Sequence, residues 1–125
     1  MTRKASQVLF ESQEKRNQIR GMFVERHGDP NIGDIVGYCV TGALLCEMGA
    51  YANIEGTPIN PREQIEAEYG ISAVETSDSE EIDCPYYDND ACEGYSTTFD
   101  IIVHLNDYHK LSFKEIGQYL QEMGY

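Results

Sequence analysis

The segment Ile35–Met48 constrains the fold more than any other part of this chain. Its sequence, IVGYCVTGALLCEM, is apolar on nearly every side and carries one charged residue, Glu47. A helix without a polar face must be surrounded by other elements, so we expect this segment to form the central helix of a small globular domain. Asp34 is the expected N-cap of that helix, and Gly49 is its expected end.

Two small residues lie in the middle of this segment. Glycine in a helix interior costs about 1 kcal/mol relative to alanine, so a close backbone contact should compensate for Gly42. We predict that the turn formed by Asn106 and Asp107 packs against Gly42 and Ala43. The Asp107 side chain is expected to accept a hydrogen bond from the backbone of the central helix or of the final helix.

Other segments carry helix signals of their own. Residues 5–26 place apolar side chains on one helical stripe, which predicts a long amphipathic helix. A capping-box pattern precedes each of two further helices, in residues 60–70 and 112–124. Residues 99–106 predict another helix, capped by one of the two threonines before it, although their β-branched run also fits a buried strand.

These segments together predict an all-α fold. We expect a single domain, residues 1–125, built as a helical bundle of about five helices around the buried central helix. A chain of this length buries about two thirds of its unfolded surface in one core. Residues 72–96 show neither a helix nor a strand period and are predicted to form a long acidic loop or insertion within the domain, with disorder as the open alternative.

The charge distribution limits the partners that this chain can take. Nine Lys and Arg against 22 Asp and Glu give a formal net charge of -13, and residues 63–109 contain no Lys or Arg. Nucleic-acid backbones require a basic surface, so we expect no direct nucleic-acid binding and a protein partner, with a basic partner favoured. The central apolar run falls short of the ~20 residues of a membrane span, and without a signal-peptide pattern we expect a cytoplasmic protein.

Two short motifs resemble those of a known family. The stretch Tyr38–Leu44, YCVTGAL, and the pair Asn106–Asp107 followed by SFKEIGQYL are similar to motifs of a small, uncharacterised domain family of bacteria and phages. That family has a Trp-Cys-x-x-Gly-Ala-Leu helix and an Asn-Asp turn before a Ser/Thr-x-x-Glu helix. This chain departs from the pattern in having Tyr38 in place of tryptophan and in its acidic insertion. The resemblance implies an all-helical domain of bacterial or phage origin, where the host cytoplasm is the expected location, and it implies no activity.

A cysteine-dependent active site is one alternative. Cys39, His104 and Asn106 follow the chain order of the nucleophile, base and orienting amide in papain-like enzymes. The competing interpretation is that Cys39 is a buried core thiol on an apolar helix, since cysteine is among the most buried residue types. The apolar surroundings favour the second interpretation, so we expect a protein that is not an enzyme.

The cysteine spacing does not predict a zinc site. Cys39 and Cys46 share a helix face and, with a histidine, are a conceivable ligand set, but structural zinc sites normally use closely paired cysteines such as C-x-x-C. Cys84 and Cys92 flank the sequence PYYDNDA, where a disulfide or a metal clip would close the acidic segment. Its carboxylates depart from the calcium-loop pattern. We therefore expect neither a bound metal nor a cofactor.

The leading functional hypothesis is a non-enzymatic interaction protein that binds a protein partner through its acidic, tyrosine-bearing segment. One alternative is an acidic mimic of nucleic acid that inhibits a host or defence enzyme. The other is a small cysteine-dependent hydrolase. The candidate partner-binding residues are Tyr86, Tyr87, Asp88, Asp90, Glu93 and Tyr95.

Overall fold

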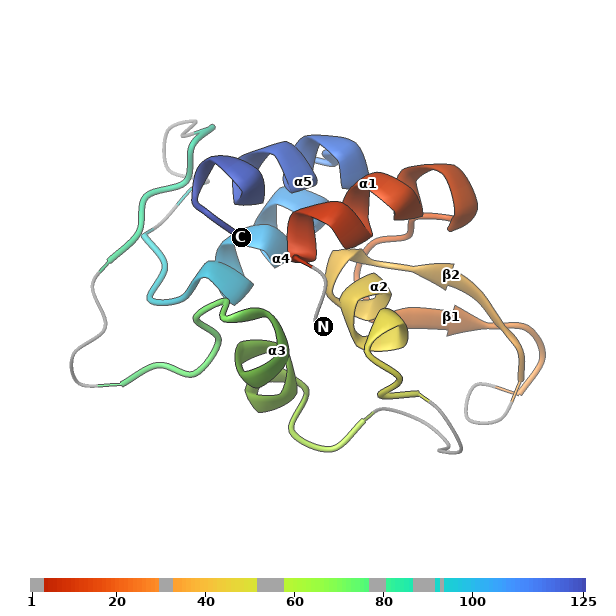
Figure 1. Ribbon diagram of the computed structural model, residues 1–125. Coiled ribbons are helices and arrows are strands. Elements are labelled where there is room, and N and C mark those ends of the chain that lie inside the picture. The colour runs from red at the N-terminus through yellow and green to blue at the C-terminus, as the bar shows by residue number, and fades with distance from the viewer. Residues whose placement is uncertain (1–3, 30–32, 52–57, 77–80, 87–91, 93) are drawn as a thin grey trace.

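The computed structural model describes residues 4–29, 33–51, 58–76, 81–86, 92 and 94–125. These residues form five helices and one two-stranded antiparallel sheet (Figure 1). The prediction of an all-α fold is therefore wrong, because a small sheet accompanies the helices. In chain order, the elements are α1 (Ala5–Lys15), β1 (Val24–Arg26), β2 (Ile35–Tyr38), α2 (Val40–Glu47), α3 (Pro61–Tyr69), α4 (Thr98–Asp107) and α5 (Phe113–Glu122).

The segment predicted as one central helix is divided into a strand and a helix. β2 pairs with β1, with Val24 opposite Tyr38 and Glu25 opposite Gly37. Helix α2 begins only after Cys39, whose backbone is extended and whose sulfur accepts a hydrogen bond from a backbone N–H of the first turn. Asp34 is thus not the N-cap. The strand forms because its pairing partner lies upstream in the chain, which the apolar pattern of the segment itself does not reveal.

The first predicted helix also ends earlier than expected, at Lys15. The backbone after it pairs with the end of β2, since Tyr38 N donates to Asn17 O (2.8 Å) and Ile19 N donates to Tyr38 O (2.9 Å). Gly21 then adopts φ of +84°, a left-handed conformation that a helix cannot contain. Apolar residues beyond position 15 therefore pack from extended backbone rather than from a helical stripe.

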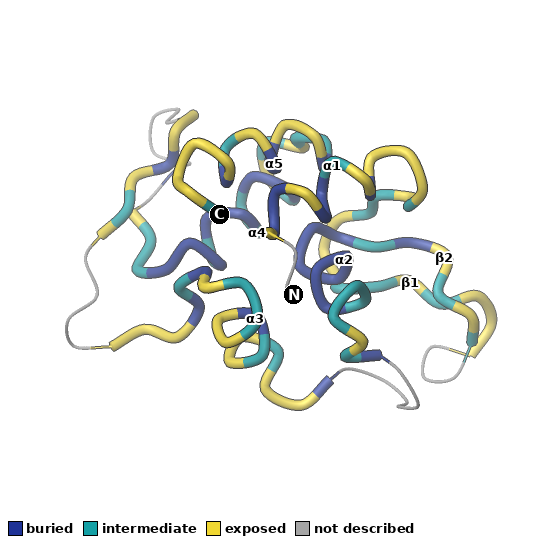
Figure 2. The backbone as a smooth tube through the Cα atoms, in the orientation of Figure 1, coloured by how far each residue is buried: buried dark blue, intermediate teal, exposed yellow. Residues whose placement is uncertain are grey.

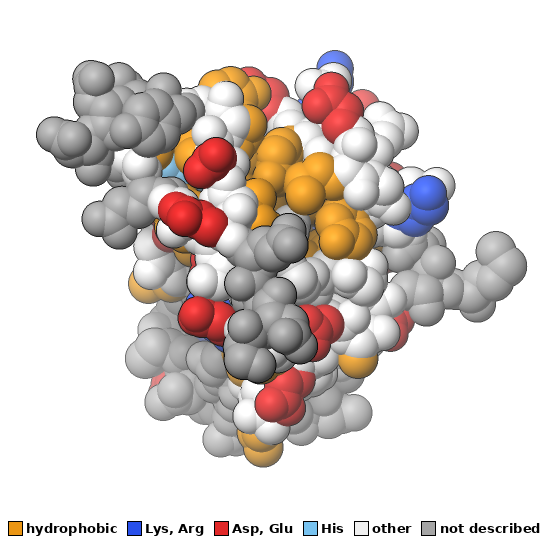
Figure 3. Space-filling view, turned by 90° about the vertical axis from the view of Figure 1, so that its left-hand side faces the viewer, with side chains coloured by type: hydrophobic (Ala, Val, Ile, Leu, Met, Phe, Trp, Pro, Cys, Tyr) orange, Lys and Arg blue, Asp and Glu red, His pale blue; other side chains and the backbone are white. Residues whose placement is uncertain are grey.

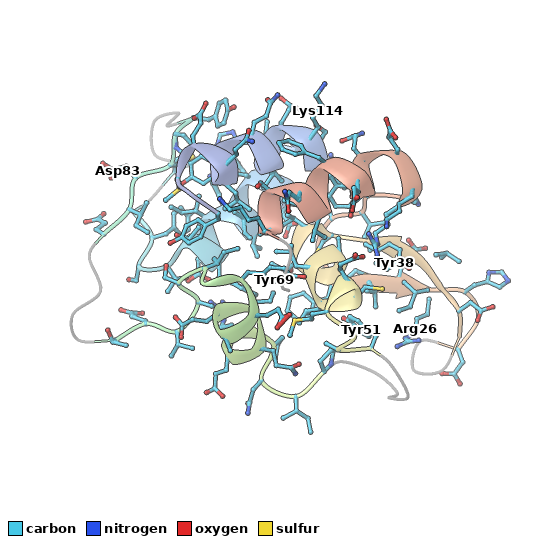
Figure 4. The ribbon with its side chains drawn as sticks, in the orientation of Figure 1. Arg26, Tyr38, Tyr51, Tyr69, Asp83 and Lys114 are labelled. Carbon is cyan, nitrogen blue, oxygen red and sulfur yellow. The ribbon has the colours of Figure 1, made fainter. Side chains whose placement is uncertain are left out.

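Helix α2 is the centre of the core, as the apolar pattern predicted. Residues 40–45 are all buried, and α1, α3 and α4 pack around α2 while α5 covers α1 and α4 (Figures 1 and 2). The close contact predicted at Gly42 exists, but it is made by Phe23: a Cβ at Gly42 would collide with the Phe23 carbonyl oxygen. Tyr69 of α3 adds a polar contact, since its hydroxyl donates to Leu44 O at 2.9 Å (Figure 4).

The residues Asn106 and Asp107 end α4 rather than forming a turn between helices. Asn106 does reach the start of α2, because its Oδ1 accepts from Val40 N at 3.2 Å. Asp107 Oδ1 accepts from Gly21 N at 3.0 Å. The prediction that Asp107 bonds the backbone of the central or final helix is therefore wrong; it instead holds the connection that leads into β1.

The helix boundaries with local capping signals are confirmed. Thr97 caps α4 by accepting from Asp100 N, and Ser112 and Glu115 form the predicted capping box of α5. Helix α3 ends at Gly70 as expected, but the backbone of Asn60 is left-handed (φ 51°) and its side chain makes no capping bond.

The described part of residues 72–96 contains no helix or strand element. An isolated antiparallel bridge joins Ile82 to Tyr95 and brings the two ends of the segment together. Four of the predicted partner-binding residues lie outside the described part of the chain: Tyr87, Asp88, Asp90 and Glu93. No helix in the described residues is long and apolar enough to cross a membrane.

Candidate metal centre

Four metal-ligating side chains converge beside α4: Cys84, Cys92, His104 and His109. Their donor atoms all lie within 4.8 Å of one another. The Nε2 atom of His109 is 3.3 Å from each of the two sulfurs, and Nε2 of His104 is 3.4 Å from Cys92 Sγ. A tetrahedral zinc ion with ordinary bond lengths holds sulfur and nitrogen ligands about 3.6 Å apart. The donors are therefore spaced almost as a bound zinc ion requires.

The two histidines come from the C-terminal end of α4. Five residues along an α-helix correspond to a rotation of about 140° beyond a full turn, so His104 and His109 would not share a face of a continuous helix. The helix ends at Asp107, and Lys110 adopts a left-handed conformation with φ of 55°. The backbone N–H of His109 still donates to His104 O at 3.4 Å. This helix end, closed by a hydrogen bond that spans five residues, places the His109 ring 4.8 Å from the His104 ring.

The two cysteines are positioned by the bridge between Ile82 and Tyr95. Ile82 N donates to Tyr95 O (2.6 Å), and Tyr95 N donates to Ile82 O (2.9 Å). Cys84 follows Ile82 by two residues and Cys92 precedes Tyr95 by three, so both sulfurs lie on the same side of the bridge. Each cysteine is buried, with 4% of its surface exposed. The bridge thus directs both thiols toward the end of α4.

The surroundings favour the uncharged forms of Cys84 and His104 when no cation is bound. Burial raises the pKa of the Cys84 thiol, and the neighbouring Cys92 raises it further. A hydrogen bond from the backbone of Tyr86 lowers this pKa but does not cancel the rise. Burial and the neighbouring His109 lower the pKa of His104. A neutral imidazole is the form that binds a metal, and a thiol deprotonates when it does so. Two thiolates would then balance the charge of one divalent cation.

Aromatic rings fix the orientation of both imidazoles. The ring of His104 stacks on Tyr108 (5.1 Å between centroids, 8° between planes) and lies 5.1 Å from Tyr95. The ring of His109 lies 4.9 Å from Tyr108 and 5.6 Å from Tyr86. Ligand rings held by their neighbours lose little entropy on metal binding. The site is thus preorganised by tyrosines that flank it.

The donor set indicates the class of ion. Thiolate and imidazole ligands suit zinc, whereas calcium and magnesium require oxygen ligands. Structural zinc sites use four protein ligands, while catalytic sites use three and keep one position for water. Two cysteines and two histidines supply a complete set of four, so the arrangement fits a structural ion.

The predicted catalytic set is not assembled in this structure. Cys39 is buried at the N-cap of α2, where its sulfur lies 3.1 Å from Thr41 Oγ1 and accepts from Gly42 N at 3.3 Å. Burial raises the pKa of this thiol, which opposes a nucleophilic thiolate. His104, the proposed base, directs Nε2 toward Cys92 instead.

The third member of that set, Asn106, has a structural environment. Its side chain is fully buried; Oδ1 accepts from Gln18 Nε2 (2.8 Å) as well as from Val40 N, and Nδ2 donates to Ile19 O (2.9 Å) and Asp107 Oδ1 (2.8 Å). Three of these four bonds join α4 to α2 and to the connection before β1, and the fourth is made to the neighbouring residue of α4.

The sequence contained part of the signal for the metal centre. His104 and His109 are separated by four residues, within the H-x3–5-H spacing of zinc sites, and eleven residues separate Cys92 from His104. Seven residues separate Cys84 from Cys92, where the sequence left a disulfide or a metal clip open, and the expectation of no bound metal rested on the spacing of Cys39 and Cys46. The convergence depends on the bridge between Ile82 and Tyr95.

Comparison of the chain with protein-family models, with curated proteins and with solved structures found no match. The resemblance to a bacterial and phage domain family therefore stays a prediction.

Proposed function

We propose that this protein binds one zinc ion through Cys84, Cys92, His104 and His109, and that the ion has a structural role. The observation that supports this proposal is the convergence of two thiols and two imidazoles, from two separate parts of the chain, within 4.8 Å. Such a set is rarely retained for packing alone, because four buried or half-buried polar groups carry a desolvation cost that a cation offsets.

The ion would fasten the acidic segment to the helical core. Cys84 and Cys92 belong to the segment of residues 81–95, and the histidines belong to the end of α4. Apparent binding free energies of structural zinc are about 10–16 kcal/mol in zinc-finger peptides, as large as the whole stability of a small domain. Zinc binding would therefore decide whether the segment stays packed against α4.

Metal analysis of the purified protein tests this proposal. We expect one zinc per chain by elemental analysis, retained through gel filtration, and loss of that zinc in Cys84→Ser and His109→Ala variants. Matched controls are Cys46→Ser and His27→Ala, which remove one cysteine and one histidine outside the centre. Zinc content well below one per chain after growth in zinc-supplemented medium, or equal zinc loss in the control variants, would contradict the proposal.

We also propose that the segment held by the ion is a binding surface for a protein partner, as the charge pattern suggests. Tyr86, which contacts the His109 ring, has 48% of its surface exposed, and Glu81 and Asp83 beside it are exposed. Figure 4 shows Asp83 at the outer edge of the molecule. On this face, carboxylates lie to the left and upper right of a patch of hydrophobic side chains (Figure 3). An exposed tyrosine among carboxylates supplies contact area and favours a basic partner.

Removal of zinc with a chelator distinguishes partner binding by this surface from non-specific charge attraction. We expect partner capture from host extract to weaken with salt and to fall on chelation of zinc, while Tyr86→Ala weakens capture without changing the zinc content. Capture that is unaffected by Tyr86→Ala and by removal of zinc would contradict a role for this surface.

A further inference from the structure

The two sulfurs of the metal centre lie near one another as well as near the histidines. Cys84 Sγ and Cys92 Sγ each lie 3.3 Å from the same atom, His109 Nε2, and at most 4.8 Å from each other. A disulfide requires Cβ atoms about 3.5–4.5 Å apart and sulfurs at about 2.05 Å. The two sulfurs are thus already close enough for side-chain rotation to be the main movement that a disulfide would need.

We infer that the metal centre is also a redox switch, in which a peroxide joins Cys84 to Cys92 in a disulfide and releases the zinc ion. This inference rests on the proposed zinc site, because the thiolates that react are the ones that the ion stabilises. The other two cysteines take no part. Cys39 is enclosed at the N-cap of α2, and Cys46 lies in the last turn of that helix, away from the metal centre.

The chemistry balances with hydrogen peroxide as the oxidant. One zinc-bound thiolate attacks a peroxide oxygen, the O–O bond breaks, and the sulfur becomes a sulfenic acid while the hydroxide released takes up a proton to form water. The second thiolate attacks that sulfur, the S–S bond forms, and the S–O bond breaks with loss of a second hydroxide, which is also protonated. Two thiolates, one peroxide and two protons thus give one disulfide and two waters. Two electrons pass from the sulfurs to the peroxide.

The disulfide changes how the acidic segment is attached. It consumes both sulfur ligands, and the two imidazoles that remain hold zinc far more weakly than four ligands do. The loop from Cys84 to Cys92 stays closed, but its connection through the ion to His104 and His109 is lost. Oxidation would therefore remove the tie that the ion makes between the two cysteines and the end of α4. A dithiol reductant with zinc would restore the connection.

The experiment treats the zinc-loaded, full-length protein with hydrogen peroxide in the presence of a chromophoric zinc chelator. We expect release of one zinc per chain, a product lighter than the reduced apo-protein by two hydrogen atoms, and a Cys84–Cys92 linkage in peptide mapping. Dithiothreitol followed by zinc should restore full zinc content. Zinc that stays bound with unmodified thiols, release with sulfinic acid as the main product, or a linkage to Cys39 or Cys46 would each overturn the switch.

Two variants sharpen this test. Cys46→Ser keeps all four ligands and should release zinc as the wild type does. Cys84→His keeps four donor side chains but has one thiol in the centre, so reversible release of zinc should be lost. If this variant does not bind zinc, peptide mapping of the oxidised wild-type protein tests the switch instead, through the presence or absence of the Cys84–Cys92 linkage. A protein that holds no zinc before peroxide is added refutes the zinc site itself, whereas a zinc-loaded protein that resists peroxide refutes the switch alone.

Discussion

Replacement of Asn106 by alanine should strongly destabilise the fold, because the role of this side chain is structural rather than catalytic. The side chain makes four hydrogen bonds of 2.8–3.2 Å in a fully buried position. Each contributes about 1 kcal/mol net, and truncation leaves the buried N–H of Val40 and the partly buried carbonyl of Ile19 without their partner. We therefore expect a loss of about 3–5 kcal/mol in the free energy of unfolding. That loss is a large share of the about 5–15 kcal/mol that a domain of this kind has in total.

Urea unfolding followed by circular dichroism measures this effect. Asn17→Ala is the matched control, because Asn17 is exposed and its Nδ2 makes one long bond, 3.5 Å to Val36 O. We expect that control to lie within about 0.5 kcal/mol of the wild type. The structural account of Asn106 fails if Asn106→Ala changes the free energy of unfolding by less than about 1 kcal/mol while the unfolding slope stays the same.

Three further predictions concern other parts of the molecule. Gly42→Ala should lower the free energy of unfolding by about 1–3 kcal/mol in the same urea assay, because the added Cβ meets a backbone carbonyl that cannot move freely; an unchanged midpoint would contradict this. Burial raises the pKa of Asp100, whereas hydrogen bonds and the charge of Arg62 lower it, and the net effect holds this pKa below its usual value. Arg62 Nη2 lies 2.7 Å from Asp100 Oδ1. The pair is therefore stabilising above the unfolded-state pKa of about 3.9 and loses its effect as the pH falls through the lower folded-state value. Because both side chains are partly exposed, Asp100→Asn should cost about 0.5–1 kcal/mol at pH 7 and nothing in acid; an equal cost at both pH values in urea unfolding would argue against the ion pair. Cys39 should resist iodoacetamide at pH 7 in the folded protein and react fully in urea, as measured by peptide mass, and rapid labelling of the native protein would reopen the hydrolase hypothesis.

The features that sequence could predict are those whose partners lie within one turn of helix. Ser112 with Glu115, and Thr97 with the backbone of Asp100, form caps over three residues, so their patterns are complete in a short window. The apolar run of α2 likewise predicted a buried helix. The strand Ile35–Tyr38 was missed because it is defined by pairing with β1. Nothing within those four residues distinguishes the start of a buried helix from a strand.

The metal centre illustrates the same limit for function. The spacing of His104 and His109 is a local signal, but it becomes meaningful only when two thiols are brought to it. That step depends on the bridge between Ile82 and Tyr95, which joins residues thirteen positions apart through backbone bonds that carry no sequence signature. The early end of α4 is equally necessary, because a longer helix would direct His109 away from His104.

The ligand environment of zinc in the loaded protein is the most direct measure of the central proposal. X-ray absorption spectroscopy at the zinc edge reports the number, type and distance of the atoms bound to the ion. We expect two sulfur ligands at about 2.3 Å and two nitrogen ligands at about 2.0–2.1 Å in the wild-type protein, and no bound zinc in a Cys84→Ser, Cys92→Ser double variant. A zinc shell composed of oxygen and nitrogen alone in the wild-type protein would contradict the account.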